Sequence, residues 1–429
     1  NRLKAPLIQG EETTWATIDN RLGKELKAAK SVRVLTGSVI SPSAQSAINQ
    51  MIGGTIEGEE STNNKHVVAD AISYSGILEA NNESFGKAVI PTYNFEKAKT
   101  IVSVGADYMG NWLDALQYVN DYTQTRKPNN DWMSKTFQFE ASMSLTGTNA
   151  DVRVPVKPSE YGAIISSLYT HLGGNGGAKT AYDARVKEAA DALKANKGES
   201  IVVCGSNDKN VQVLVNAINE LLGNYGKTVD VNTVSNSKQG LDSEVAALIA
   251  DMNAGKVDAL LIHGIDPVFT IGDAFSKAMK KVKTTVSFAT KMDDTSEACT
   301  YVCPSNHALE SWSDANPVTG HYSLGQPTIS PLFDTRQTEE SLLKWSGNEL
   351  SYHDYIQKYW KENVFPHSGS LMFTDFWNKT LHDGVAVVSA PNLETTAFAG
   401  NVSKAVAAVK AIKGNGIELE LVQNMGVGA

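Results

Sequence analysis

The stretch that decides the fold is Val257-Asp258-Ala259-Leu260-Leu261-Ile262-His263-Gly264-Ile265-Asp266-Pro267. Its continuous apolar run predicts a strand buried on both faces, and Gly264 predicts a turn where that strand ends. Periodic apolar residues predict a helix before it, over 241–254, and another after it, over 274–281. A buried strand between two amphipathic helices is typical of a parallel sheet that is covered by helices.

The same alternation continues along most of the chain. Strands are predicted over 31–36, 66–69, 100–104, 136–140, 201–204 and 285–288. Helices are predicted over 41–52, 160–172, 183–195 and 210–222, with a further one that carries Trp112, Leu113, Leu116 and Val119 on one face. We expect Ile101, Val102, Val104, Val202, Val203, Leu260, Leu261 and Ile262 to be buried. The pattern predicts an α/β protein with two parallel-sheet, Rossmann-like domains.

The predicted domains divide the chain at residues 155 and 290. The first α/β domain covers 1–155 with the N-terminal segment, and the second covers 156–290. Residues 291–429 are rich in Pro, Gly, Ser and aromatic side chains and have few periodic stretches. We expect this third part to be an irregular segment that wraps back over the domains. Its return strand (384–389) and helix (402–412) are expected to pack on the first domain.

Composition narrows the class of function. The chain has 429 residues, 41% of them apolar, and a net charge of −9 with scattered basic residues. A nucleic-acid surface or an anionic lipid surface requires clustered Lys and Arg, so neither partner is expected. No run of 18 apolar residues is present, so no membrane span is expected. The chain begins at Asn1 without a visible signal peptide, as we expect of a mature or truncated chain.

Three cysteines are too few for a cluster or a structural zinc site that needs four thiolates. Cys299 and Cys303 flank a short predicted strand, where they would point to the same face roughly 13 Å apart. That separation is too great for a disulfide. We interpret both, together with Cys204, as small core residues and expect no metal on this chain.

Other motifs have simple structural interpretations. Gly173 to Thr180 resembles a phosphate-binding loop, but a helix rather than a strand precedes it, so we interpret it as a helix end. His263, His307 and His321 are interpreted as hydrogen-bonded structural residues. The carboxylates around Asp293 and Glu297 leave two interpretations open: a divalent-cation site, or the cap of a short helix.

Several segments carry a resemblance to a known family. They are Phe85 to Pro91, Phe95 to Asp107, Asp258 to Pro267, and Asp293 to Pro304 followed by Leu309-Glu310. In their order and spacing these segments resemble the inner α/β domains of the molybdopterin-oxidoreductase family, whose fold is that of dimethyl-sulfoxide reductase. Phe137 to Gly147, Gly320 to Pro327 and Pro331 to Arg336 resemble the large iron–sulfur, molybdopterin-like subunit of bacterial alternative complex III.

The resemblance implies a role in a respiratory complex. In that branch the molybdopterin-like part is a cofactor-free structural domain of a membrane-bound quinol:electron-acceptor oxidoreductase, and iron–sulfur clusters lie elsewhere in the assembly. The implied partners are cytochrome c and integral-membrane quinol-binding subunits. The implied location is the periplasmic side of the bacterial inner membrane, and no catalytic site is expected in this chain.

Two alternatives remain open. One is an active bis-molybdopterin catalytic subunit, similar to polysulfide or thiosulfate reductase; the other is a stand-alone nucleotide-binding or small-ligand-binding module. An active relative has a four-cysteine cluster domain before the region matching Asn1 and a cap domain after the region matching Ala429. It also supplies a metal ligand from the loop that matches 71–76. That loop has no thiolate here, which leaves Ser73 and Ser75 as vestigial ligand candidates.

In an active relative, strand-end loops hold two pterin nucleotides in a cleft between the domains. The corresponding candidates in this chain are Gly37, Gly105, Asp107, Gly205, Gly264 and Asp266. These loops carry carboxylates, hydroxyls and an amide but no Arg or Lys, and acidic groups repel phosphate. Asp107 or Asp266 could still bind ribose hydroxyls. We expect the cleft to be filled by the chain's own side chains or by water.

Overall fold

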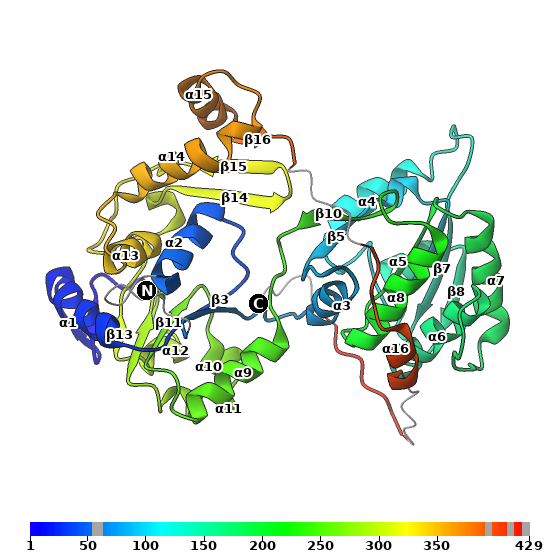
Figure 1. Cartoon of the computed structure of the whole chain (residues 1–429), viewed down its shortest axis with the longest axis horizontal. Helices are drawn as coiled ribbons and strands as arrows, with labels where there is room; N and C mark the ends of the chain where they lie inside the picture. Colours follow the sequence, from blue (N-terminus) through cyan, green and yellow to red (C-terminus); the bar gives the residue numbers. More distant parts are fainter. Residues whose placement is uncertain (54–62, 391–396, 410–415, 423–429) are drawn as a thin grey trace. The chain divides into compact units, whose positions relative to one another are not determined.

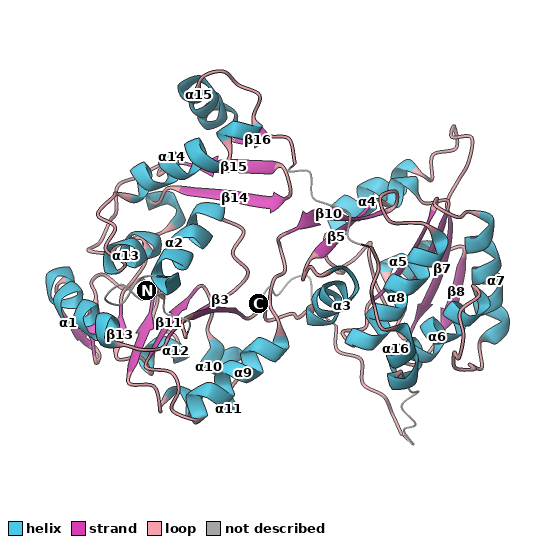
Figure 2. Ribbon diagram, in the orientation of Figure 1, coloured by secondary structure: helices cyan, strands magenta, loops and turns pink. Residues whose placement is uncertain are grey.

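The computed structural model describes residues 1–53, 63–390, 397–409 and 416–422. The chain forms two compact units. Unit 1 consists of residues 1–71 and 236–392, and unit 2 consists of residues 72–235 and 393–429. Figure 1 labels the elements, and Figure 2 shows helices and strands alternating within each unit. The α/β class with parallel sheets, predicted from the alternating pattern, is confirmed.

Unit 1 is built on a seven-stranded sheet with the order β2-β1-β13-β12-β11-β3-β4. The strands are β1 (Leu7–Ile8), β2 (Glu11–Glu12), β3 (Val32–Thr36), β4 (Lys65–Val68), β11 (Ala259–His263), β12 (Thr284–Ser287) and β13 (Tyr301–Val302). The five strands from β13 to β4 run parallel, whereas β1 pairs antiparallel with both of its neighbours. The quoted stretch therefore forms a central strand, and both of its faces are covered.

Helices cover both faces of this sheet. Side chains of α1 (Trp15–Ala28), α2 (Pro42–Gly53) and α13 (Thr338–Trp345) pack with Val34 and Leu261 in one buried cluster. Side chains of α9 (Asp242–Asn253) and α11 (Asp273–Met279) pack with Leu260 and Ile262 in another. Successive residues of a strand point to opposite faces, so Leu260 and Leu261 enter different clusters. Two short helices, α10 (Pro267–Thr270) and α12 (Asp294–Glu297), follow strands of the sheet.

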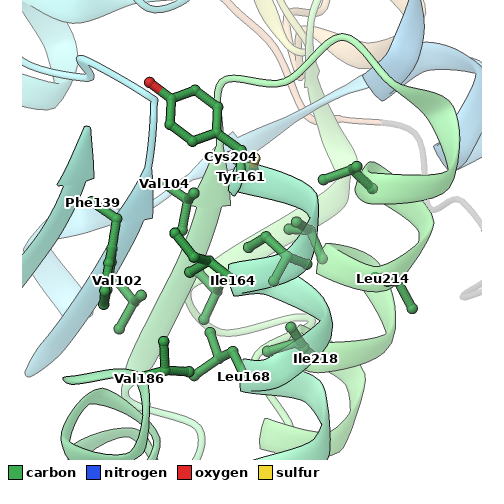
Figure 3. Close-up of a cluster of buried hydrophobic side chains, with 14 of the residues drawn as sticks. Val102, Val104, Phe139, Tyr161, Ile164, Leu168, Val186, Cys204, Leu214 and Ile218 are labelled. Atoms are coloured by element: carbon green, nitrogen blue, oxygen red, sulfur yellow. The ribbon is translucent and has the colours of Figure 1, made fainter. Parts of the chain in front are cut away.

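Unit 2 is built on a four-stranded parallel sheet with the order β8-β7-β6-β9. The strands are β6 (Thr100–Val104), β7 (Lys135–Glu140), β8 (Val152–Pro155) and β9 (Ser200–Cys204). On one face they pack with α6 (Tyr161–His171), α7 (Asp183–Ala195), α8 (Lys209–Leu222) and α16 (Val402–Ala408). Figure 3 shows this cluster, with the ring of Tyr161 at its edge. The unit also contains α3 (Ser75–Phe85), α4 (Ala115–Gln124), α5 (Leu145–Asn149) and the antiparallel pair β5 (Ile90–Tyr93) and β10 (Val229–Ser235).

The predicted domain boundaries are wrong, because strands on opposite sides of a predicted boundary pair in the same sheet. The β3 strand was predicted to belong to the first domain, yet it pairs with β11 of the predicted second domain. In the same way β9 pairs with β6. A parallel sheet joins strands that are distant in the chain. A boundary at residue 155 would therefore cut through both sheets, and one at residue 290 would separate β13 from β12 in the sheet of unit 1. The third predicted part, 291–429, is also divided, with 291–392 in unit 1 and 393–429 in unit 2.

The region after residue 292 is more regular than predicted. It contains the antiparallel strands β14 (Ser313–Val318), β15 (His321–Gly325) and β16 (Val385–Val387), and the helices α14 (Tyr352–Asn363) and α15 (Phe373–Asp383). Aromatic residues such as Trp360 and Trp377 form its buried cluster, so the aromatic enrichment marks a core. The return strand predicted over 384–389 corresponds to β16, which pairs with β15 in unit 1. The predicted helix 402–412 is α16 over Val402–Ala408, and 410–412 lie outside the described residues.

Two smaller predictions are also corrected. The helix expected to carry Trp112, Leu113, Leu116 and Val119 begins only at Ala115, and Leu116 is exposed. Asp114 caps this helix through its side chain, which places Trp112 and Leu113 before it. Cys299 and Cys303 do not share a face, since the strand between them is only Tyr301–Val302 and the two thiols enter different clusters. The eight strand residues predicted to be buried are all buried.

Candidate ligand sites at the strand ends

In unit 1 the candidate glycines Gly37 and Gly264 lie side by side, since β3 and β11 are neighbouring parallel strands that end at Thr36 and His263. A pocket with a cavity volume of about 230 Å³ opens at these strand ends. Its apolar lining includes Val34, Ile48, Phe288 and Leu342, and its polar lining includes Thr36, Ser38, Ser41, His263, Thr338 and Glu339. The carboxyl end of a parallel sheet is the usual place for a ligand.

His263 is a neutral, packed residue of this pocket. The Thr338 hydroxyl lies 3.2 Å from its Nδ1, and its ring meets Phe288 edge to face with 6.0 Å between centroids. Burial lowers the pKa of His263, and the nearby Glu339 opposes that shift. The imidazole is therefore uncharged at neutral pH. The prediction that this histidine is a hydrogen-bonded structural residue agrees with these contacts.

The charges around the pocket do not suit a phosphate. No Lys or Arg lies among the described residues that line it, and Glu339 adds a carboxylate. Uncompensated phosphate charge beside a carboxylate is unfavourable in a half-enclosed site. The unit 1 pocket therefore fits a neutral or cationic group better than the pyrophosphate of a pterin nucleotide.

Asp70 organises the same strand-end region, and the sequence analysis missed it. Its carboxylate accepts from the Ser38 hydroxyl at 2.8 and 2.9 Å, from the Gln239 N–H at 3.1 Å and from the Gly240 N–H at 2.9 Å. It lies two residues beyond the end of β4. That position at a strand end is the signal that could have identified it, because Asp107 and Asp266 were selected on the same ground.

The acidic candidates near β11 cap helices. Asp266 accepts from the Phe269 N–H at the start of α10 and from the Thr295 hydroxyl at 2.5 Å. Asp293 accepts from the Ser296 N–H at 2.7 Å and caps α12. Of the two open interpretations for Asp293 and Glu297, the helix cap matches these bonds. The described residues contain no group of three or more His, Cys, Asp or Glu arranged to hold a metal ion.

In unit 2 the candidate glycines Gly105 and Gly205 follow the neighbouring strands β6 and β9. A Cβ on Gly205 would overlap the Gly105 carbonyl oxygen, and a Cβ on Gly105 would overlap the Tyr161 ring. Gly105 also has a φ of +67°, which favours glycine. Both glycines are thus explained by packing within unit 2. The two glycine pairs belong to different units, and a cleft that joins all four loops stays a prediction.

The vestigial ligand candidates Ser73 and Ser75 are part of a local hydrogen-bond network. The Ser73 hydroxyl accepts from the Asn207 side-chain amide and from the Ser75 N–H, both at 3.1 Å. The Asn207 side-chain carbonyl oxygen in turn accepts from the Gly76 N–H at 2.7 Å. Ser75 is the first residue of α3 and is buried. These contacts hold the start of α3 on the loop after β9, and hard hydroxyl groups are a poorer fit to molybdenum than a thiolate.

The surroundings of the three thiols make them unreactive. Cys204, Cys299 and Cys303 are free and buried. Burial raises the pKa of Cys204 and of Cys299 to about 12, and it raises the pKa of Cys303 as well. A thiol that stays protonated is a poor metal ligand and a poor nucleophile. This supports the interpretation of all three as core residues.

The glycine-rich stretch after α6 and His307 have structural roles too. The stretch Gly173 to Thr180 follows α6, and Gly173 has a φ of +107°, as the predicted helix end requires. His307 accepts from the Leu309 N–H at 3.1 Å through Nδ1 and caps a short 3₁₀ turn (Ala308–Glu310). His321 lies exposed in β15. None of these three contributes to the strand-end sites.

Comparisons with known proteins agree with this architecture. No family model matches the chain. The molybdopterin-binding-like subunit of menaquinone reductase from Nitratidesulfovibrio vulgaris is 22% identical over 398 residues, which cover 81% of this chain and 57% of that protein. Acetylene hydratase from Pelobacter acetylenicus superposes with a TM-score of 0.62 at 13% identity, covering 91% of this chain and 67% of that one. A chain of the formyltransferase/hydrolase complex from Methylorubrum extorquens superposes with a TM-score of 0.53 at 12% identity, covering 82% of this chain and 99% of that one.

The comparisons confirm the broader of the two resemblances drawn from the sequence, the one to the molybdopterin-oxidoreductase family. Acetylene hydratase has a molybdopterin-enzyme fold, and this chain has the same fold. The curated relative carries the same family likeness in its description as molybdopterin-binding-like. The chain spans little more than half the length of that relative. No helix among the described residues is both long and apolar enough to cross a bilayer.

Proposed function

Since the chain has a molybdopterin-enzyme fold and resembles a menaquinone reductase subunit, we propose that it is a cofactor-free structural domain of a membrane-bound respiratory oxidoreductase. In this proposal the complex oxidises a quinol and resembles alternative complex III. Its electrons pass through iron–sulfur clusters that lie elsewhere in the assembly. The chain's role is to support the subunits that carry those groups.

One observation carries the proposal: the residues that could contact a pterin nucleotide already have partners within their own unit. Asp266 caps α10 and bonds to Thr295, while Asp107 accepts two bonds from Thr146. The described lining of the unit 1 pocket adds no cation for a phosphate. Serines stand where an active relative supplies a metal ligand. This donor set does not fit a molybdopterin, so no catalytic step is assigned to the chain.

The proposed setting follows from the sequence resemblance to the alternative complex III subunit. The partners are cytochrome c and integral-membrane quinol-binding subunits, and the chain lies on the periplasmic side of a bacterial inner membrane. The alternative, an active bis-molybdopterin subunit, drew its support from the strand-end glycines. The intramolecular contacts of Gly105 and Gly205 explain two of these four glycines without a ligand, because each of the two is required by a neighbour in the same unit.

The test is elemental and pterin analysis of the intact complex purified from its source. Molybdenum and tungsten are measured by mass spectrometry, and pterin is measured by the fluorescence of its oxidised derivative after denaturation. We expect iron in stoichiometric amounts, with molybdenum, tungsten and pterin far below one per chain. Stoichiometric pterin and metal would contradict the proposal and favour the catalytic alternative.

A further inference from the structure

The segment Ile417-Glu418-Leu419-Glu420-Leu421 docks on unit 2 in an unusual way. Its three aliphatic side chains are exposed at 102%, 80% and 87% of their full area. A surface segment normally buries such side chains and leaves its charged residues in water. Here the order is reversed, and the two carboxylates face the protein. The segment is therefore held by its acidic groups.

The Glu418 carboxylate lies at the start of a helix. It accepts from the Ser159 N–H at 3.1 Å and from the Ser159 hydroxyl at 2.7 Å. Ser159 belongs to a 3₁₀ turn (Pro158–Glu160) that continues directly into α6. The first N–H groups of a helix lack partners within the helix and favour an anion. These bonds, with a contribution from Lys157, lower the pKa of Glu418.

The Glu420 carboxylate extends the same contact to two more donors. It accepts from the Tyr161 hydroxyl and from the Ser142 hydroxyl, both at 2.9 Å. Ser142 lies two residues beyond the end of β7, and Tyr161 is the first residue of α6, the helix that follows β8. The four donor groups therefore gather at the carboxyl ends of two neighbouring strands. Figure 3 shows the Tyr161 hydroxyl pointing away from the apolar cluster.

The nature of these donors defines what the surface recognises. A backbone N–H and three hydroxyl groups converge on two carboxylates that are two residues apart, with Lys157 nearby. Hydroxyls, helix N–H groups and a lysine also bind phosphate oxygens. The surface thus has the chemistry of a site for a polyanion, and carboxylates of the same chain fill it.

We propose that residues 417–421 form an internal plug, in which Glu418 and Glu420 take the place of a diphosphate and hold the strand-end site of unit 2 closed. The plug rests on the proposed function, because it explains how a strand-end site stays free of a phosphate-bearing ligand. Opening the plug frees the donor groups of Ser142, Ser159 and Tyr161 for an external anion. The ligand class of the opened site is a diphosphate.

The experiment compares wild-type protein with the double variant Glu418→Gln/Glu420→Gln. Each also carries Leu419→Cys with a nitroxide spin label, and because the native thiols are buried, the introduced thiol is the reactive one among the described residues. Spectra report the mobility of the segment, and titration calorimetry with inorganic pyrophosphate reports binding. Glu11→Gln/Glu12→Gln, an exposed pair on β2, removes the same charge elsewhere.

We expect an immobilised label and no pyrophosphate binding in the wild type and in the control. In the double variant we expect a mobile label and pyrophosphate binding with a Kd at least about tenfold below the highest concentration at which the wild type shows none. Ser159→Ala in that background should abolish this binding. Equal mobility in wild type and double variant overturns the plug, as does pyrophosphate binding by the wild type. A released segment without binding overturns the anion site. Molybdenum in the purified complex would contradict the proposed function and leave these measurements unchanged, so the two failures are distinguishable.

Discussion

The carboxylate of Asp107 accepts two hydrogen bonds from Thr146, one from its backbone N–H at 2.9 Å and one from its hydroxyl at 2.7 Å. The Thr146 hydroxyl oxygen also accepts from the Met109 N–H at 3.0 Å. Thr146 is fully buried in α5. The side chain that the sequence offered as a ribose ligand is therefore a brace between the loop after β6 and the helix after β7.

Removing the brace should destabilise the protein. In Asp107→Ala the buried N–H and hydroxyl of Thr146 lose their acceptor, which should cost about 1–3 kcal/mol of unfolding free energy. Asp107→Asn keeps an acceptor oxygen at the same position and should cost less. Urea denaturation of both variants gives the comparison. Equal losses would mean that the carboxylate charge matters more than the hydrogen bonds to Thr146.

The strand-end glycine of β9 is expected to be intolerant of any side chain. Gly205→Ala places a Cβ against the Gly105 carbonyl, so backbone must move and stability should fall by about 1–3 kcal/mol. Gly23→Ala is the matched control. Gly23 lies inside α1, where a Cβ meets nothing, and the substitution should raise stability by about 0.5–1 kcal/mol. Thermal unfolding of both variants measures the two effects, and a neutral Gly205→Ala would contradict the packing argument.

Core truncation should separate the two types of leucine. Leu261 is fully buried in the central strand β11, and Leu261→Ala should cost about 2–5 kcal/mol. Leu116 is 87% exposed in α4, and Leu116→Ala should change stability by less than about 0.5 kcal/mol. Chemical denaturation measures both free energies of unfolding, and the comparison requires that the variants and the wild type have the same dependence of that free energy on denaturant concentration. A small loss at Leu261 would mean that β11 does not lie in the sheet as described.

His66 should make stability depend on pH. The Thr36 hydroxyl donates to the Gly37 carbonyl and lies 2.8 Å from His66 Nε2, while the Gln45 side-chain amide lies 3.2 Å from Nδ1. This arrangement fits a neutral ring with its proton on Nε2. Burial lowers the pKa of His66 from 6.5 to about 4. The neutral ring is therefore favoured in the folded state.

The sign of the effect follows from this shift. Between pH 6.5 and 4 the unfolded chain binds a proton at His66 that the folded chain does not, so stability falls as pH decreases through that range. The loss at pH 5 should be on the order of 1–2 kcal/mol relative to pH 7. His66→Gln should remove this component, whereas His321→Gln at an exposed position should leave it. NMR titration of the His66 ring gives its pKa directly, and a value near 6.5 would contradict the burial argument.

The sequence by itself determined the class of fold and its central strands. The run Val257–Asp266 predicted a buried strand that ends in a turn, and β11 (Ala259–His263) has that form. Periodicity located helices such as α7 and α8 to within a residue. Such predictions succeed because a buried strand or an amphipathic helix is encoded by neighbours a few residues apart. The family resemblance depended on the same short segments.

The tertiary structure alone decided which strands share a sheet and which polar residues are already engaged. The pairing of β3 with β11 and the contact of Glu420 with Ser142 join residues that are distant in the sequence. No local pattern records such a partner. Asp107 and Asp266 showed the residue type and strand-end position of ligand-binding carboxylates, yet Thr146 and Thr295 satisfy them. The sequence gives the chemistry of a side chain, but the fold determines which group that side chain contacts.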